Sequence, residues 1–132
     1  MPLFSSGKEV PNSAVALAVQ GIAKDKNRIF IASGGGTAAL TGKACSPTGA
    51  LWLYDTYALG RGIALANTSG ASDGWFFITA DYAFGRAMEA EVRKVVEAAG
   101  GRTLGSVRHP VGNQDFSSFL LQAQSSGAKI VG

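Results

Sequence analysis

The residues that could do chemistry are concentrated in a glycine-rich stretch, Ser33-Gly34-Gly35-Gly36-Thr37-Ala38-Ala39. It follows a short apolar run and fits a relaxed dinucleotide-binding pattern, G-x-G-x-x-A, with Asp55 nineteen residues after Gly36. In that chemistry the glycines let the backbone approach a pyrophosphate at the N-terminus of a helix. Turn-forming residues at 41–49 interrupt any such helix here. A Rossmann-like nucleotide-binding enzyme that uses the Gly34–Ala39 loop therefore stays an alternative hypothesis.

The same stretch favours ligand binding by backbone groups. Ser33 and the three glycines leave backbone N–H groups unblocked at the carboxyl end of a predicted strand, where open α/β sheets bind ligands. These donors suit a carboxylate, and Thr37 would add a hydroxyl. A second strand-end segment, 81–85, carries the aromatic residues Tyr82 and Phe84 at a predicted helix N-terminus. The two segments would face one crevice if the two halves of the chain are separate lobes.

Two other patterns do not support catalysis. Residues 70–74 match G-x-S-x-G, but a nucleophile elbow needs a strand before it, and here the predicted strand comes after it. His109 is the only histidine and is predicted to lie in a turn beside Pro110, with no cysteine nearby. We therefore expect no catalytic residue, no metal site and no cofactor.

The composition indicates a folded domain with a core. Of the 132 residues, 46% are hydrophobic and 16% are charged, which is well below the charged share of about 25% in typical domains. The formal net charge of +3 is too small to indicate a nucleic-acid or membrane-surface partner. The single cysteine, Cys45, cannot form an internal disulfide.

Hydrophobic periodicity in the first half predicts the elements that hold the glycine-rich stretch. Residues 12–24 are predicted to form a helix that begins at Asn12 or Ser13. Its expected buried stripe is Val15, Ala18, Val19 and Ile22. Residues 28–32 and 51–55 are predicted strands, with a turn-rich segment between them, and residues 56–66 are a predicted helix.

The second half predicts a strand-helix-strand-helix-strand pattern. The strands are expected at 75–79, 102–107 and 129–131, and the helices after Asp81 and Asp115, the expected N-caps. A pair between Glu89 and Arg93 should support the first helix. Together these elements predict an α/β fold with a mostly parallel sheet. Loop-forming residues at 67–74 predict a boundary between domains 1–70 and 71–132.

Four segments resemble the ABC-transporter substrate-binding proteins of the leucine/isoleucine/valine-binding type. They are residues 12–20, 40–47, 75–85 and 115–124, in the family's order and spacing, and the resemblance covers the chain from about residue 10. It implies a type I periplasmic-binding-protein fold, no enzymatic activity, a periplasmic location and an ABC permease as membrane partner. It also implies a fragment without the family's signal peptide. Residues 1–70 would be part of lobe one with the first hinge crossing, and residues 71–132 the start of lobe two.

The resemblance also implies which residues bind the ligand. In branched-chain amino-acid receptors, the loop that matches residues 33–37 binds the ligand carboxylate through backbone amides and small hydroxyls. Phe84 matches a lobe-two aromatic residue that is often tyrosine in those receptors, and the missing hydroxyl weakens the case for an amino-acid ligand. The predicted ligand-binding set is Ser33, Gly35, Gly36, Thr37, Trp52, Tyr54, Tyr82 and Phe84.

The expected ligand is a small carboxylate, either a branched-chain amino acid or an aromatic or apolar acid. Trp52, Tyr54 and Tyr82 enter the set by pattern alone, as aromatic side chains that could line such a ligand. Because the same fold also serves as the effector domain of some regulators, a ligand-sensing role stays open beside transport.

Overall fold

The computed structural model describes residues 11–70 and 73–132. The chain divides into two compact units, which meet between Ala58 and Leu59 and are described separately below. The predicted domain boundary after residue 70 falls beside residues 71–72, which lie outside the described residues, so that boundary stays a prediction. None of the helices in the described ranges combines the length and the apolar character needed to cross a membrane.

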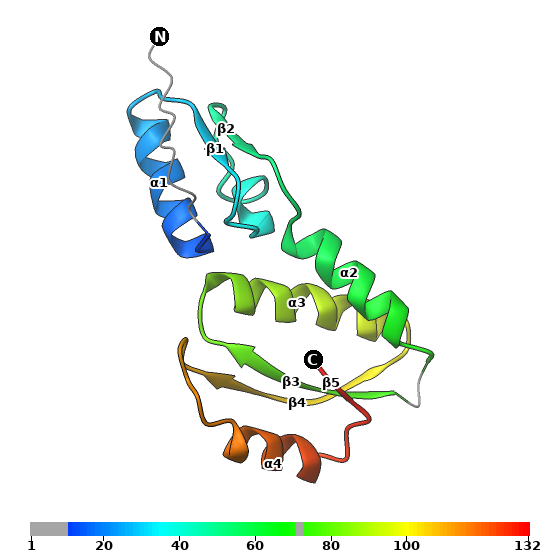
Figure 1. The fold of residues 1–132 in the computed structure, drawn as a ribbon. Helices are drawn as coiled ribbons and strands as arrows, with labels where there is room; N and C mark the ends of the chain where they lie inside the picture. Colours follow the sequence, from blue (N-terminus) through cyan, green and yellow to red (C-terminus); the bar gives the residue numbers. More distant parts are fainter. Residues whose placement is uncertain (1–10, 71–72) are drawn as a thin grey trace. The chain divides into compact units, whose positions relative to one another are not determined.

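The first unit consists of a helix packed on a small parallel sheet (Figure 1). Helix α1 covers Ser13–Asp25, strands β1 and β2 cover Phe30–Ala32 and Gly49–Leu51, and a short 3-10 helix, η1, covers Ala38–Leu40. As predicted, Asn12 caps α1, because its side-chain oxygen accepts the N–H of Ala14 at 2.9 Å. The buried apolar residues of this unit are Ala16, Phe30, Ala32 and Leu40.

The predicted buried face of α1 is wrong. Val15 and Ile22 are 50% and 57% exposed, Ala18 is also exposed, and only Val19 packs against the core. The buried face instead carries Ser13, Ala16 and Gln20. A count of apolar residues cannot find this face, because two of its three members are polar.

Gln20 is buried because its amide is satisfied inside the unit. Its Nε2 donates to the backbone carbonyls of Leu40 at 2.9 Å and Ala44 at 2.7 Å. Hydrogen bonding of this kind removes most of the cost of burying a polar group. Gln20 thereby fixes the segment that follows the glycine-rich stretch onto α1.

Strand β2 lies two residues earlier than predicted. The register pairs Phe30 with Gly49 and Ala32 with Leu51, so the strand ends where the prediction had it begin. Gly49 lies against Gln20, whose Oε1 would be 2.6 Å from a Cβ at this position. The alternating side chains after Leu51 belong to an exposed segment, in which Trp52 is 81% exposed.

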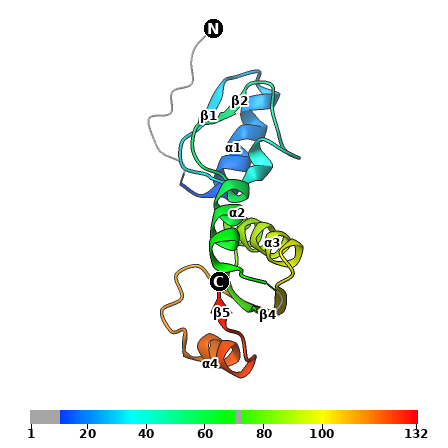
Figure 2. The same cartoon turned by 90° about the vertical axis from the view of Figure 1, so that its right-hand side faces the viewer.

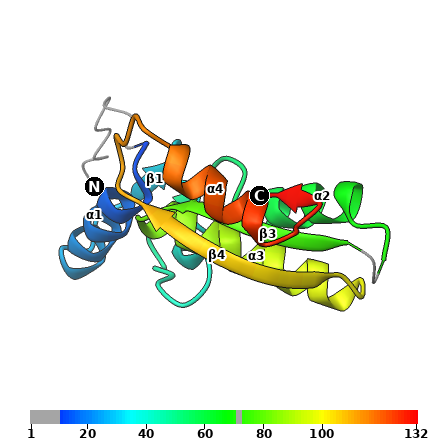
Figure 3. The same cartoon turned by 90° about the horizontal axis from the view of Figure 1, so that it is seen from below.

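The second unit contains a three-stranded parallel sheet in the order β4-β3-β5, which confirms the predicted α/β class. The strands cover Gly74–Ala80 (β3), Arg102–His109 (β4) and Ile130–Val131 (β5). Helix α3, Ala83–Ala98, covers one face of the sheet and α4, Ser117–Ser125, covers the other (Figures 1 and 2). Seen from below, α4 lies in front of β3 (Figure 3).

The core of the second unit is built on β3. Trp75 and Phe77 point to the α3 side and pack with Val92 and Val96 of α3. Helix α2, Thr56–Asn67, begins in the first unit and continues in the second, where Ala64 joins this core. Burial of β3 on both faces explains its continuous apolar run.

Two of the predicted positions at the carboxyl edge of this sheet are wrong. His109 is the last residue of β4 and does not lie in a turn. Asp81 does not cap α3, since Tyr82 occupies the N-cap and the Asp81 carboxylate pairs with Arg86 at 2.9 Å. The predicted pair of Glu89 and Arg93 is confirmed, at 2.6 Å.

Asp115 lies one residue before the N-cap of α4, which is Phe116. Its carboxylate still accepts the backbone N–H of Ser117 at 2.9 Å. Hydrogen bonds from the side chain and the backbone of Ser117 lower the pKa of Asp115. The predicted interaction at this helix start is thus present, shifted by one position.

The turn from β3 into α3 requires glycine at position 85. A Cβ at Gly85 would collide with the backbone carbonyl oxygen of Ala80, which cannot move without breaking the strand end. Gly85 therefore allows the first turn of α3 to lie close to the end of β3. This close approach also determines where Tyr82 and Phe84 lie.

We expect Gly85→Ala to lower the free energy of unfolding by about 3 kcal/mol, because the new methyl group meets backbone. Urea unfolding followed by circular dichroism measures the change. The matched control is Gly62→Ala in α2, where a Cβ meets nothing within 4 Å. This control should gain roughly 0.5–1 kcal/mol from helix propensity. Equal stability of Gly85→Ala and the wild type would contradict the packing described here.

Candidate functional site

The glycine-rich loop, residues 33–37, lies at the carboxyl end of β1. Ser33 is exposed, whereas Gly35, Gly36 and Thr37 are buried. Within residues 11–70 and 73–132, none of the backbone N–H groups of the five loop residues donates a hydrogen bond. Unpaired backbone N–H groups bind an anion where they point to one place, which makes this loop a candidate anion site.

The loop is held in place by the segment that follows β2. The carbonyl oxygen of Gly36 accepts the backbone N–H of Thr56 at 2.8 Å, and the Oγ1 of Thr56 accepts the N–H of Ala38 at 3.1 Å. A Cβ at Gly36 would lie 3.1 Å from the ring of Tyr54. The absence of a side chain at position 36 thus allows the two loops to approach.

The predicted site residues of the first unit differ in their surroundings. Gly36 and Tyr54 lie side by side, as the close approach shows. Thr37 is only 2% exposed, and its hydroxyl caps η1 by accepting the N–H of Ala39 at 3.3 Å. Trp52 is 81% exposed and Tyr54 is 50% exposed, so both present aromatic surface to the solvent.

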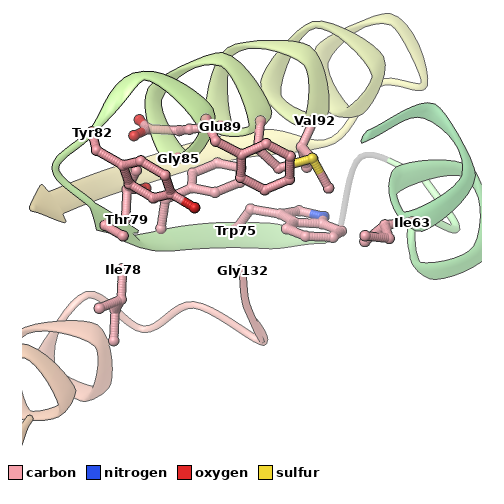
Figure 4. A pocket seen from close by; sticks show the side chains of 13 residues that line it. Ile63, Trp75, Ile78, Thr79, Tyr82, Gly85, Glu89, Val92 and Gly132 are labelled. Carbon is pink, nitrogen blue, oxygen red and sulfur yellow. The ribbon is translucent and has the colours of Figure 1, made fainter. Parts of the chain in front are cut away.

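The predicted site residues of the second unit line one cavity. The rings of Tyr82 and Phe84 are tilted toward each other, with centroids 6.1 Å apart. They bound a cavity of about 270 Å³. Figure 4 shows Tyr82 on one side of it and Trp75 and Ile63 on another. Its other lining residues are Phe77, Ile78, Thr79, Ala80, Gly85, Met88, Glu89, Val92 and Gly132.

The cavity is mainly apolar, with one carboxylate in its lining. Glu89 is 9% exposed and its Oε1 accepts from Arg93 at 2.6 Å, while Oε2 has no hydrogen-bond partner among the described residues. Burial alone raises the pKa of Glu89, but the nearby hydroxyls of Thr79 and Ser106, the hydrogen bond from Arg93 and the charge of Arg93 outweigh it. The pKa of Glu89 is therefore lowered, and the group is an ion-pair member at neutral pH.

Sequence reasoning missed both Thr56 and this cavity. Thr56 is fully buried. Threonine is common at the start of a helix as a capping residue, so the sequence does not show that this one also binds the loop. The apolar run 75–79, followed by Tyr82 and Phe84, is consistent with such a cavity. The sequence does not predict it, however, because the cavity forms only where α3 packs on β3.

The loop does not have the geometry of a dinucleotide site. The pattern needs an α-helix whose N-terminus faces the pyrophosphate. The element after residues 33–37 is η1, a three-residue 3-10 helix. Across the described part of the chain, no group of three or more histidine, cysteine or acidic side chains is placed to hold a metal ion.

Comparison with known proteins identifies similar sequences and folds. The family described as periplasmic binding protein matches residues 9–132. A periplasmic binding protein from Burkholderia mallei is 49% identical over 92% of this chain and 32% of its own, with a TM-score of 0.88. None of the curated proteins compared with the chain matches it.

Two further solved structures resemble the chain. A branched-chain amino acid ABC transporter periplasmic ligand-binding protein from Burkholderia xenovorans is 33% identical over 97% of this chain and 35% of its own, with a TM-score of 0.74. An ABC transporter solute-binding protein from R. palustris, solved with benzoate, shares the fold at 22% identity, over 90% of this chain and 33% of its own, with a TM-score of 0.79. The chain spans about a third of the length of these structures.

The lowered pKa of Glu89 predicts a pH-dependent contribution to stability. Because the folded pKa lies below the ordinary value of 4.5, the ionised carboxylate stabilises the fold above pH 4.5, and this is lost as the pH falls through the folded pKa. The difference in unfolding free energy between wild type and Glu89→Gln, measured in urea, should therefore be full at pH 7 and shrink below pH 4.5.

The control for this titration is Glu91→Gln, which removes the surface pair with Lys94, itself 69% exposed. Exposed pairs contribute little, so this variant should stay close to the wild type at each pH. A Glu89→Gln difference that is the same at pH 3 and pH 7 would show that the carboxylate charge does not stabilise the fold.

Proposed function

The chain belongs to the periplasmic binding protein family, and from that premise we propose that it recognises the ligand for the solute-binding receptor of an ABC importer. The complete receptor binds a small carboxylate in the periplasm and presents it to a membrane permease. It catalyses no reaction, so its output is a change of conformation on binding. Such a change follows from the ligand's higher affinity for the closed state than for the open one.

The observation that carries this proposal is the row of backbone donors at residues 33–37. No acceptor among the described residues takes these N–H groups. Hydrogen bonds from N–H groups to an ionised acceptor are shorter and stronger than neutral ones. None of the five loop residues is charged. We therefore assign recognition of the ligand carboxylate to the backbone of Ser33, Gly35, Gly36 and Thr37, with the exposed Ser33 hydroxyl beside it.

The aromatic members of the proposed site bind the apolar body of the ligand. Trp52 and Tyr54 are exposed in the first unit, and Tyr82 and Phe84 form a tilted pair in the second. We propose that the aromatic side chains of both units contact the same ligand. Aromatic rings offer flat, apolar surface to a benzoate ring or a branched aliphatic chain. One similar structure holds benzoate and another is described as a branched-chain amino acid ligand-binding protein, which supports this ligand class.

Phe84 favours an aromatic or aliphatic acid over an amino acid within this class. Its ring has no hydroxyl that could form a hydrogen bond with a polar group of the ligand. The cavity that it lines is mainly apolar. A buried ammonium group would need acceptors. Glu89 already pairs with Arg93 through Oε1. Its Oε2, which has no hydrogen-bond partner among the described residues, is the carboxylate oxygen left for a cation, and the rest of the lining is mainly apolar.

Isothermal titration of the full-length receptor tests the proposal. Benzoate, 4-hydroxybenzoate and L-leucine should include a ligand with a micromolar Kd. The matched neutral analogues, methyl benzoate, methyl 4-hydroxybenzoate and L-leucinamide, keep the body and lose the carboxylate. Loss of charge-assisted hydrogen bonds, each contributing about 1.5–3 kcal/mol, should weaken binding by about tenfold or more per bond.

Equal affinity for an acid and its neutral analogue would contradict carboxylate recognition by the loop. Binding of none of the three acids would contradict the ligand class. The full-length receptor is the right sample, because the proposed contacts come from both units and closure needs both lobes.

A further inference from the structure

We propose that Thr56 is the positioning residue of the carboxylate-binding loop, which it holds in the binding geometry without contacting the ligand. The inference rests on the proposed function of residues 33–37. It concerns a residue that takes no part in the predicted binding set and that lies at the first position of α2.

Two hydrogen bonds connect Thr56 to the loop and come from different parts of the residue. Its backbone N–H donates to the carbonyl of Gly36 at 2.8 Å. Its hydroxyl oxygen accepts the N–H of Ala38 at 3.1 Å. Thr56 is fully buried, so water does not compete for these bonds. The two bonds bracket Thr37 and fix the peptide groups on either side of it.

Peptide geometry then determines where the donors of the loop point. In a trans peptide the C=O and the following N–H are antiparallel, and no cis peptide occurs in the described ranges. Since the carbonyl of Gly36 is turned toward Thr56, the N–H of Thr37 points away from it. Thr56 therefore keeps the N–H of Thr37, which has no acceptor among the described residues, on the side of the loop that faces away from Thr56.

The next peptide group obeys the same rule. The N–H of Ala38 is turned toward the Thr56 hydroxyl, so the carbonyl of Thr37 points away, and it accepts the N–H of Leu40 at 3.1 Å. The carbonyl that could repel a carboxylate is thereby engaged in η1. The arrangement separates donors from acceptors at the position where an anion would bind.

The interaction also satisfies α2. The first N–H groups of a helix have no partner inside the helix. In this chain the Gly36 carbonyl accepts the first of them, from Thr56, and the Asp55 carboxylate accepts the N–H of Ala58 at 2.8 Å. The start of α2 and the loop thus supply each other's hydrogen-bond partners. If either moves, the N–H of Thr56 and the N–H of Ala38 lose their acceptors.

The test compares Thr56→Val with Thr56→Ser in the full-length receptor. Valine keeps the volume and the backbone bond but leaves the Ala38 N–H without an acceptor, whereas serine keeps the hydroxyl. Gln20→Met is the matched control, because it removes two hydrogen bonds made by a buried side chain of the same unit, to Leu40 and Ala44, outside residues 33–38. Benzoate and L-leucine are the probes, and hydrogen-exchange mass spectrometry of the peptide covering 33–40 supplies a ligand-free readout.

We expect Thr56→Val to weaken binding of the probe about tenfold and to speed exchange in the 33–40 peptide, since it leaves the half-buried N–H of Ala38 without its acceptor. Thr56→Ser should restore both to near wild type. Gln20→Met should lower the unfolding temperature with no more than about a twofold change in affinity. If Gln20→Met and Thr56→Val lose affinity in the same proportion to their loss of stability, Thr56 stabilises the fold and does not position the loop.

The outcomes separate this inference from the proposed function. Wild type that binds neither probe refutes the proposed ligand class, and the exchange measurement still decides whether Thr56 holds the loop. Wild type that binds a probe, together with Thr56→Val that binds it equally well, refutes the positioning role alone. Unchanged exchange in Thr56→Val refutes it as well.

Discussion

Parallel hydrogen bonding between strands is the constraint on which the candidate site depends. In the first unit, pairing of Ala32 with Leu51 ends β1 and β2 at the same edge, so the loops that follow them meet. In the second unit, Ala80 pairs with His109, and the N–H of Asp81 donates to the carbonyl of His109 at 2.8 Å. The β3–α3 turn therefore begins at a fixed place on its sheet edge. Ligands of open α/β proteins bind at such edges because the connecting loops, rather than the strands, carry the free polar groups.

Glycine has different uses in the two units, and this explains why the glycine-rich stretch imitates a nucleotide-binding pattern. At Gly36 the missing side chain admits the ring of Tyr54, and at Gly85 it admits the carbonyl of Ala80. Both are close approaches of one chain segment to another. A dinucleotide site uses glycine to bring the backbone close to a phosphate at a helix start. Here the short 3-10 helix η1 follows the stretch. The chain therefore shares the glycine pattern of a dinucleotide site but lacks the helix N-terminus that would bind the pyrophosphate.

The sequence predicts those parts of the fold where burial follows apolar pattern. Strand β3, which the apolar run at 75–79 predicts, is such a case and is confirmed. It does not predict the face of α1, where Gln20 is buried because two carbonyls satisfy it. It also does not predict that Asp81 pairs with Arg86 instead of capping α3. In each failure a polar side chain has two possible partners, and only the tertiary structure selects one.

The same reasoning applies to the candidate site. The loop at 33–37 could be predicted, because glycines after a strand leave N–H groups unblocked whatever surrounds them. Its support could not, because Thr56 is separated from Gly36 by the whole of η1 and β2. A loop that binds an anion through neutral backbone donors needs such support more than one that uses lysine or arginine. A long cationic side chain adjusts to its ligand at a cost in rotamer entropy, whereas peptide groups bind well only if they already point in the right direction. In the proposed site, recognition by this loop therefore depends on residues behind it that the ligand never touches.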